Sequence, residues 1–387
     1  MRIAMFTDTY LPSRDGVVTS ILTTRSELQR RGHEVFVFAP DAGRDAAKEE
    51  GVCYLRSVGF RRYPGYHVPI FPTNKCEILK KLDIDVIHSQ GLLFMALRSM
   101  FAGRSLKKPV VTSFHTMVTE AIQYYNFTPF PDYMASRLIW IYLRSLLQRS
   151  EAVIAPTEAI ANELRGYAPR MRRIEVIPTG VDAERFNPRN DGSAIRAKYG
   201  LEDKRVVMNL GRIAREKNME LVLKGFEELR KQEDDVALMV VGEGPAREYY
   251  TKMAEDLGLG RSVVFTGFVP DDELPCYYAA CDAFTIASKF ETQGLVVLEA
   301  MATGKPVSGI DYRAVAEIIT DGENGYLFKE SASGWLESTK KALNANEALK
   351  VRARERAEQY TIHEATGRLV EVYQASIHSK RKRVGLE

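Results

Sequence analysis

The chain has 387 residues, too many for one comfortable core, and this length suits two domains of roughly 150–200 residues each. Hydrophobic residues make up 45% and charged residues 27%, which is ordinary for a globular protein and excludes a disordered or fibrous chain. The net charge of +3 is unevenly divided, with +6 on residues 1–187 and −3 on the remainder. This asymmetry is too mild for a nucleic-acid-binding protein, but it is compatible with an N-terminal half that meets an anionic surface.

The sequence shows no pattern typical of a membrane span, a signal peptide or a disulfide framework. No apolar run reaches the ~18 residues that would span a bilayer. The N-terminal segment lacks the apolar region and cleavage site of a signal peptide, so we expect a cytoplasmic protein. The cysteines show neither a CxxC pair nor a paired framework, and we interpret them as reduced thiols outside any metal site: Cys53, Cys76, Cys276 and Cys281.

Short apolar runs rich in β-branched residues alternate with helix-length amphipathic stretches. In the first half the predicted strands are Ile3–Thr7, Glu34–Ala39, Val86–His88, Val110–Phe114, Ala152–Ala155 and Ile174–Ile177. Between the first two strands, apolar residues recur at helical spacing over Val17–Arg31, and Gly32 ends that helix.

The second half repeats this pattern. Its predicted strands are Val206–Leu210, Ala237–Val241, Ser262–Phe265, Ala283–Ile286 and Pro306–Ile310, with helices such as Met219–Gln232 and Gly294–Ala302 between them. Strand–helix alternation indicates parallel sheets covered on both faces. The sequence therefore predicts an α/β protein of two doubly wound domains that face each other across a cleft.

A turn-rich segment from Ile177 to Pro188 looks like the hinge between these domains. We therefore expect an N-terminal domain at 1–187, a C-terminal domain at 188–360, and a C-terminal helix with a basic tail at 361–387. The charge run Lys380–Arg383 is typical of a solvated tail.

Unusual residues follow several predicted strands, where doubly wound sheets bind ligands. Gly16 opens the first helix, and its bare backbone would let a diphosphate approach closely, although glycine at such a turn is often structural. Arg212 and Lys217 follow the strand Val206–Leu210 and could bracket a diphosphate. A solvated loop is the alternative for these two cations.

The strongest signal lies between Ser288 and Pro306. Gly294 marks a helix start and Gly304 a helix stop, so Glu291 precedes the helix and Glu299 lies inside it. A carboxylate in an otherwise apolar run needs hydrogen-bond donors, and sugar hydroxyls are such donors. We interpret both carboxylates as binding residues.

Two competing interpretations are less well supported. An NAD-dependent oxidoreductase needs GxGxxG after a strand, and Gly242-Glu243-Gly244 lacks the third glycine. Asp83 and Asp85 imitate a metal-binding Asp-x-Asp, but they precede the buried strand at Val86, so we interpret them as structural and expect no metal site.

The segment Glu291–Glu299, together with Gly211-Arg212 and Lys217, resembles the large retaining glycosyltransferase family with the GT-B fold. That family includes sucrose synthases and many bacterial and archaeal mannosyl- and glucosyltransferases. The resemblance spans nearly the whole chain. Within the family, three segments most resemble the corresponding motifs of enzymes that glycosylate diacylglycerol or related lipids: Phe6–Pro12, Asp15–Ser20 and Phe114–Met117. In one departure, Asp15 precedes Gly16 where many relatives have two glycines.

The resemblance implies a role for each matching residue. Arg212 and Lys217 would hold the donor diphosphate, Glu299 the ribose hydroxyls and Glu291 the hydroxyls of the transferred sugar. Backbone N–H groups around Gly294, Leu295 and Val296 would complete these contacts, the stretch Gly267–Val269 would meet the base, Gly16 would approach the diphosphate, and His115 would lie by the sugar.

The resemblance further implies a retaining hexosyltransferase without cofactor or metal, using a nucleotide-diphosphate sugar such as UDP-glucose. A double displacement would need a carboxylate nucleophile, which the sequence does not identify, so a same-face mechanism is favoured. The implied acceptor is a membrane lipid such as diacylglycerol. A soluble sugar or polysaccharide acceptor, or a non-catalytic sugar-nucleotide-binding protein, remains the alternative.

A lipid acceptor would make the cytoplasmic protein peripheral on the inner face of the cell membrane. The expected docking stretch interleaves cations with aromatic residues: Arg56, Arg61, Arg62, Tyr63, Tyr66, Phe71, Lys75, Lys80 and Lys81. A rival is Arg137–Arg149, with Arg137, Trp140 and Arg144 near one helix face. We expect Leu138, Ile141 and Tyr142 of that helix to pack on the sheet instead.

Overall fold

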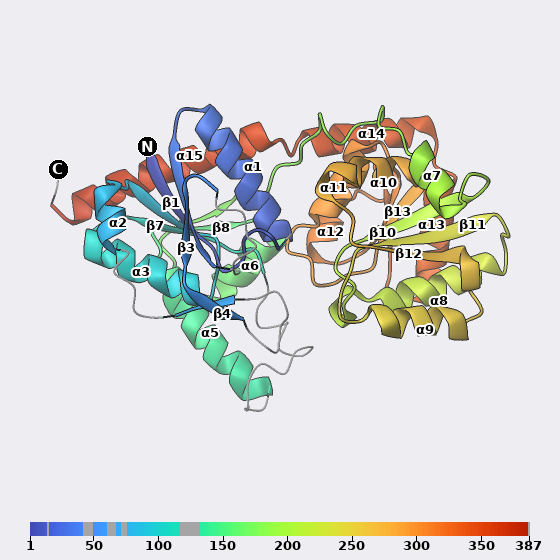
Figure 1. Cartoon of the computed structure of the whole chain (residues 1–387), viewed down its shortest axis with the longest axis horizontal. Helices are drawn as coiled ribbons and strands as arrows, with labels where there is room; N and C mark the ends of the chain where they lie inside the picture. The colour runs from blue at the N-terminus through green and yellow to red at the C-terminus, as the bar shows by residue number, and fades with distance from the viewer. Residues whose placement is uncertain (14, 42–48, 60–66, 71–75, 117–131, 386–387) are drawn as a thin grey trace. The chain divides into compact units, whose positions relative to one another are not determined.

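The computed structural model describes residues 1–13, 15–41, 49–59, 67–70, 76–116 and 132–385 (Figure 1). The chain forms two compact units. Unit 1 comprises Met1–Gly180 and Ile362–Glu387, and unit 2 comprises Val181–Thr361. The first unit therefore takes up both ends of the chain, and the boundaries lie close to those placed after residues 187 and 360 from the sequence.

Unit 1 is built on a parallel sheet with the strand order β3-β2-β1-β6-β7-β8-β9. Its strands are β1 (Arg2–Phe6), β2 (Glu34–Pro40), β3 (Val52–Leu55), β6 (Val86–Ser89), β7 (Val110–Ser113), β8 (Ala152–Ala155) and β9 (Ile174–Val176). A short antiparallel pair, β4 (Ser57–Gly59) and β5 (His67–Pro69), forms a separate sheet. Three of these strands, β3, β4 and β5, were not predicted from the sequence.

Alternate side chains of each central strand of unit 1 point to opposite faces, and both faces are covered by helices. Ile3 and Met5 belong to a core with α1 (Gly16–Arg30) and α15 (Ile362–Arg383). Ala4 and Phe6 belong to a second core with α2 (Cys76–Lys81) and α3 (Phe94–Leu106). Burial on both sides explains why these strands are almost continuously apolar. Unit 1 also contains α5 (Asp132–Arg149) and α6 (Glu158–Tyr167).

Helix α15 begins where the chain leaves unit 2 and packs on unit 1 against α1, β6 and β7 (Figure 1). It buries Leu369, Val372 and Tyr373 in the unit 1 core. The helix continues through Arg383, which forms an ion pair with the buried carboxylate of Glu151. The interpretation of the basic run as a merely solvated tail is therefore wrong for Arg383.

Unit 2 has a parallel sheet with the order β12-β11-β10-β13-β14-β15. Its strands are β10 (Arg205–Leu210), β11 (Val236–Val241), β12 (Val263–Gly267), β13 (Ala283–Ile286), β14 (Val307–Ile310) and β15 (Tyr326–Phe328). Its helices are α7 (Ser193–Tyr199), α8 (Met219–Arg230), α9 (Arg247–Asp256), α10 (Leu274–Ala280), α11 (Leu295–Ala302), α12 (Arg313–Ile318), α13 (Ala332–Leu343) and α14 (Glu347–Glu358).

Both sheets have the same kind of topology. In unit 2 the order reverses between β10 and β13, and in unit 1 it reverses between β1 and β6. Such switch points are where doubly wound sheets bind ligands, beyond the carboxyl ends of the strands. The two Rossmann-like α/β domains predicted from the sequence are confirmed. Within the described residues, no helix combines the length and apolar character required to cross a bilayer.

Candidate active site

The loop after β10 and the loop after β13 meet at the switch point of unit 2. Lys217 lies at the end of a single 3-10 turn, Arg215–Lys217, and its Nζ is 2.6 Å from Glu291 Oε1. Glu291 lies in the loop between β13 and α11. Both side chains are largely shielded from solvent, with 27% and 17% of their area exposed. The structure therefore brings together two residues that the sequence analysis placed in one site from separate motifs.

Arg212 lies half-buried just after β10, beside Gly211. Parallel strands β10 and β13 are neighbours, so their following loops share one edge of the sheet. Arg212, Lys217 and Glu291 therefore belong to the same edge, which combines two cations with a carboxylate.

Helix α11 begins at this edge and ends within the core. Gly294 caps its N-terminus in the left-handed region, with φ +81°, a conformation that favours glycine. Leu295 and Val296 form the first turn, whose amides have no partners within the helix itself. An N-terminus of this kind attracts anions and polar ligand groups.

Glu299 lies on α11 a little over one turn from its start and is only 7% exposed. Its Oε2 accepts a hydrogen bond of 2.7 Å from the Tyr278 hydroxyl. Burial raises the pKa of Glu299 to about 7, and the Tyr278 hydrogen bond opposes this rise. Burying a carboxylate is costly unless donors satisfy it, so Glu299 is a group poised to bind further donors.

The stretch after β12 contributes apolar surface. Val269 is half-buried against the unit 2 core, whereas Phe268 beside it is 65% exposed. The sequence predicted a role for this stretch but did not indicate Phe268, nor Tyr278 on α10. The signal for Phe268 in the sequence was an aromatic residue shortly after a predicted strand.

In unit 1, Gly16 is the first residue of α1 and is exposed. Asp15 caps the helix, because its Oδ1 accepts from Val18 N at 2.9 Å. No described atom lies within 4 Å of the position that a Cβ on Gly16 would take. Packing within the described residues therefore does not require glycine here.

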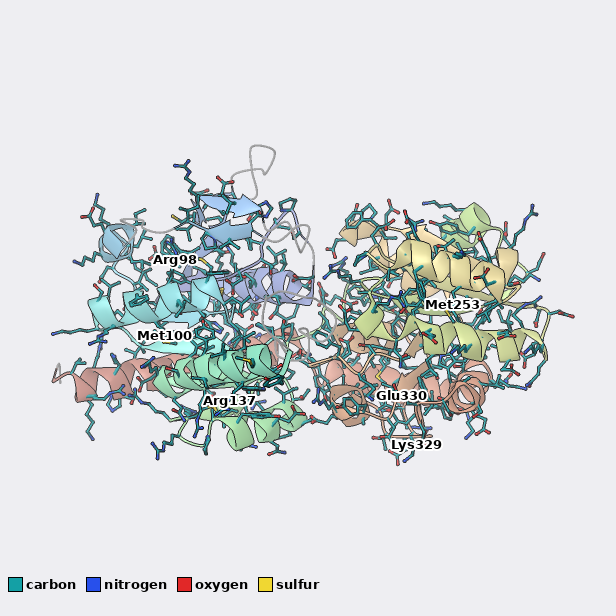
Figure 2. The ribbon with its side chains drawn as sticks, turned by 90° about the horizontal axis from the view of Figure 1, so that it is seen from below. Arg98, Met100, Arg137, Met253, Lys329 and Glu330 are labelled. Carbon is teal, nitrogen blue, oxygen red and sulfur yellow. The ribbon has the colours of Figure 1, made fainter. Side chains whose placement is uncertain are left out.

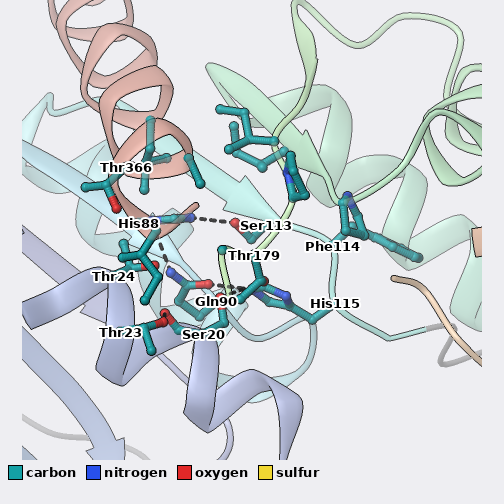
Figure 3. A pocket seen from close by; sticks show the side chains of 18 residues that line it. Ser20, Thr23, Thr24, His88, Gln90, Ser113, Phe114, His115, Thr179 and Thr366 are labelled. Carbon is teal, nitrogen blue, oxygen red and sulfur yellow. Dashed lines mark hydrogen bonds between the residues drawn. The ribbon is translucent and has the colours of Figure 1, made fainter. Parts of the chain in front are cut away.

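His115 follows β7 and lines a cavity of about 30 Å³, which has room for a water molecule (Figure 3). Its Nε2 is 2.6 Å from Gln90 Oε1, and Gln90 in turn contacts His88 of β6. Burial lowers the pKa of His115 to about 4, so the ring is neutral at pH 7. The sequence analysis missed Gln90 and His88, although a histidine within an apolar strand and a glutamine directly after it were visible signals.

Two acidic groups in unit 1 have structural roles. Asp8 caps α3, because its carboxylate oxygens accept from Leu93 N and Met95 N at 2.9 Å each. Asp85 lies at the amino end of β6, and its Oδ2 accepts from Arg2 N at 2.8 Å. These contacts account for Asp8 and for the second residue of the Asp-x-Asp pattern.

Two neighbouring helices of unit 1, α3 and α5, carry exposed apolar stripes. Figure 2 shows Arg98 and Met100 on α3 and Arg137 on α5. We call the following residues the α3–α5 stripes: Phe94, Leu97, Phe101, Tyr133, Met134, Leu138 and Ile141. From 94 to 108 and from 133 to 149 the chain contains cations but no Asp or Glu.

The stripes correct one expectation from the sequence. Leu138 and Ile141 are 53% and 59% exposed, so the prediction that they pack on the sheet is wrong. Tyr142 is half-buried and donates to Leu93 O at 2.8 Å. In the rival stretch, Arg56, Lys80 and Lys81 are exposed. Its other predicted docking residues lie outside the described residues: Arg61, Arg62, Tyr63, Tyr66, Phe71 and Lys75.

Known proteins resemble this chain over both units. A family model described as Glycosyltransferase Family 4 matches residues 14–185, and one described as Glycosyl transferases group 1 matches residues 191–362. The alpha-monoglucosyldiacylglycerol synthase of Streptococcus pneumoniae is 32% identical over 335 residues, covering 85% of this chain and 75% of that enzyme. The chain belongs to the GT-B glycosyltransferases.

Other glycosyltransferases show how varied the relatives are. A GDP-mannose-dependent alpha-mannosyltransferase of Corynebacterium glutamicum is 29% identical, with 87% of this chain and 80% of that enzyme covered. The crystal structure of Anabaena HepE with UDP and glucose aligns with a TM-score of 0.76 at 19% identity, covering 97% of this chain and 99% of HepE. The structural similarity establishes the GT-B fold of this glycosyltransferase, while the names of these relatives include both GDP-mannose and UDP.

Proposed function

We propose that this glycosyltransferase transfers a hexose, with glucose as the first candidate, from a nucleotide-diphosphate sugar to a membrane lipid such as diacylglycerol, with retention of configuration and without a metal. The observation that carries the proposal is the Lys217–Glu291 pair at the switch point of unit 2, next to the N-terminus of α11. It joins a cation suited to a diphosphate with a carboxylate suited to sugar hydroxyls.

In the proposed donor site, four side chains bind different parts of the sugar nucleotide. Arg212 and Lys217 offset the negative charge of the leaving diphosphate, which grows as the glycosidic bond breaks. Glu291 accepts hydrogen bonds from the transferred sugar, and Glu299 accepts them from the ribose. Leu295 and Val296 lie at the start of α11, where backbone N–H groups suit phosphate or sugar oxygens.

Further proposed contacts surround this donor. Val269, after β12, lies by the base, and Gly294 allows the tight entry into α11. In unit 1, Gly16 approaches the diphosphate and His115 contacts the transferred sugar. Because the two carboxylates are assigned to hydroxyls, we propose a same-face reaction, in which the leaving phosphate helps to deprotonate the acceptor.

The relatives support a lipid acceptor. The Streptococcus enzyme is named for diacylglycerol. The α3–α5 stripes give this chain an exposed apolar surface on helices whose charged residues are cations, apart from Asp132 at the start of α5. Basic side chains near an anionic bilayer contribute ~1 kcal/mol each, and aromatic rings suit its interface. We therefore propose that these stripes dock unit 1 on anionic membranes, at the inner face of the cell membrane.

A panel of labelled UDP-, GDP- and ADP-sugars, each incubated with diacylglycerol vesicles or with soluble sugars, tests the reaction. We expect transfer from UDP-glucose to the lipid, with a product whose anomeric configuration by NMR matches the donor. Transfer only to soluble sugars would refute the lipid acceptor. Binding of sugar nucleotides without any transfer would favour a non-catalytic protein.

Flotation with vesicles of graded anionic content tests the docking surface. Binding should increase with anionic lipid and weaken at high salt, since salt screens the cations. The double variant Phe101→Asp, Leu138→Asp should lose binding. The control Val351→Asp changes a similarly exposed residue (55%) on α14 of unit 2 and should retain it. Equal binding by both variants would exclude the α3–α5 stripes.

A further inference from the structure

A chain of buried polar groups in unit 1 ends at His115 (Figure 3). His88 of β6 is 1% exposed, and its Nε2 is 2.8 Å from Ser113 Oγ. Its Nδ1 is 2.6 Å from the Tyr373 hydroxyl of α15 and 3.2 Å from Gln90 Nε2. Gln90, 3% exposed, reaches His115 Nε2 through Oε1 at 2.6 Å. Tyr373, His88 and Gln90 therefore form a hydrogen-bonded chain of buried side chains that ends at the His115 ring.

The chemistry of the Gln90 amide determines where the protons lie in this chain. An amide nitrogen only donates, so His88 Nδ1 accepts and carries no proton. The Tyr373 hydroxyl, at 2.6 Å, donates to the same nitrogen and shares its single lone pair with the more distant Gln90 amide. His88 then donates through Nε2 to Ser113. At the other end, the Gln90 carbonyl only accepts, so His115 carries its proton on Nε2. Nδ1 is consequently the acceptor nitrogen of the His115 ring.

The imidazole rings of His88 and His115 are both neutral at pH 7, so the tautomer of each ring decides which of its nitrogens donates and which accepts. Burial lowers the pKa of His88 to about 3 and that of His115 to about 4. Among the described residues that line the cavity, these two histidines are the titratable ones, and Tyr373 contacts His88 from α15. A neutral imidazole has one donor and one acceptor nitrogen, and its partners decide which is which.

We propose that Gln90 is a positioning residue for His115, and that the buried chain Tyr373–His88–Gln90 holds the ring in the Nε2–H tautomer with Nδ1 as its acceptor. This inference rests on the proposed function, in which His115 contacts the transferred sugar. A sugar hydroxyl donates to an acceptor nitrogen, so the tautomer decides whether that contact forms. Tyr373 lies 285 residues from His88 in sequence, so the C-terminal helix completes a site whose other parts lie in the first third of the chain.

Three variants test whether Gln90 orients the His115 ring through hydrogen bonds or only fills space in the core. Gln90→Met keeps the length of the side chain but removes both hydrogen bonds. Gln90→Glu keeps an acceptor for His115 and adds a charge that raises the pKa of that ring. Tyr373→Phe removes one donor at the far end of the chain. Ser376→Ala is the matched control, since Ser376 is buried on the same helix as Tyr373 but is not one of the residues that link His88, Gln90 and His115.

Imidazole ¹⁵N NMR of the six histidines in the full chain reads the tautomers without any substrate. We expect one Nε2–H tautomer of His115 in the wild type and in Ser376→Ala, and a mixture in Gln90→Met. Tyr373→Phe should loosen the tautomer of His88. Because this readout needs no sugar donor, failure of the proposed function would leave it interpretable.

Kinetics test the consequence for catalysis. Gln90→Met should lower kcat on the order of 10-fold, the scale of one lost hydrogen bond, with a smaller change in donor KM. Gln90→Glu should add an acid-side inflection to the pH–rate profile above pH 4, while Ser376→Ala leaves the profile unchanged. If Gln90→Met fails to fold, Gln90→Glu and Tyr373→Phe carry the test. A single unchanged His115 tautomer in Gln90→Met would overturn the proposal, and so would an unchanged pH–rate profile in Gln90→Glu.

Discussion

Replacing Glu299 by glutamine should stabilise the free protein and weaken donor binding at the same time. Glu299 is almost completely buried, and its pKa of about 7 lies well above the ordinary value of 4.5. The folded state therefore binds the proton more tightly than the unfolded state does. The contribution of Glu299 to stability is therefore greatest below pH 4.5 and is lost as the pH rises through 7. Above pH 7 the buried charge costs about 3 kcal/mol.

Glutamine keeps an oxygen that accepts from Tyr278, and it never ionises. Relative to wild type, Glu299→Gln should therefore gain about 2–3 kcal/mol more stability at pH 8 than at pH 5. Urea unfolding at the two pH values measures this difference. The chain has two tryptophans, so in a Trp140→Phe background the fluorescence of Trp335 reports unit 2 alone. An equal effect of the substitution at both pH values would refute the reasoning that ionisation of Glu299 carries the cost.

Donor binding should respond in the opposite direction. If the ionised Glu299 accepts from ribose hydroxyls, removing its charge costs ~1.5–3 kcal/mol, or roughly 10- to 150-fold in affinity at pH 8. Wild-type affinity should also fall as the pH drops below 7, by up to about 10-fold per pH unit, whereas Glu299→Gln should not show this dependence. Calorimetry with the sugar nucleotide that the panel selects measures both. Unchanged affinity in the folded variant would remove Glu299 from the donor site.

Three further predictions concern other parts of the molecule. If both cations stabilise the leaving diphosphate as proposed, Arg212→Ala and Lys217→Ala should each lower kcat on the order of 10²-fold, and more than they raise donor KM. A rise in KM alone would assign them to ground-state binding. Activity should persist in excess EDTA, and loss of activity with rescue by manganese or magnesium would reopen the roles of Asp83 and Asp85. Asp15→Ala should destabilise unit 1 by about 1 kcal/mol in urea unfolding, since it removes the cap on Val18 N, and an unchanged midpoint would show that the cap contributes nothing.

Local sequence patterns determined most of the architecture. Apolar runs buried on both faces predicted the central strands within one or two residues, as at Ala152–Ala155 and Ala283–Ile286. Glycines marked helix ends where their φ is positive, as at Gly294 and Gly304. The patterns missed β3, β15 and the β4–β5 pair, because short strands at a sheet edge or outside it carry little periodic signal.

The helix α5 shows why the solvent exposure of a side chain cannot be predicted from an amphipathic pattern alone. Its sequence is amphipathic, and an apolar stripe predicts contact with a core. Leu138 and Ile141 are nevertheless exposed, because nothing in the local pattern says which face meets the sheet and which is left open. A stripe of this kind can serve a core or an external surface equally well, and only the packing of the chain distinguishes the two.

Motifs along the chain predicted Lys217, Glu291 and Glu299 as one group, since Lys217 and Glu291 follow neighbouring strands and Glu299 lies in the helix that begins at the same sheet edge. The contact between Lys217 Nζ and Glu291 Oε1 depends on β10 and β13 being neighbours, although these residues are 74 positions apart. Tyr278 beside Glu299, and Gln90, His88 and Tyr373 behind His115, carried no motif that linked them. Sequence chemistry determines which side chains are able to bind a charge or a hydroxyl. Hydrogen bonds extend only about 3 Å, so which of these side chains are partners is decided by the tertiary structure alone.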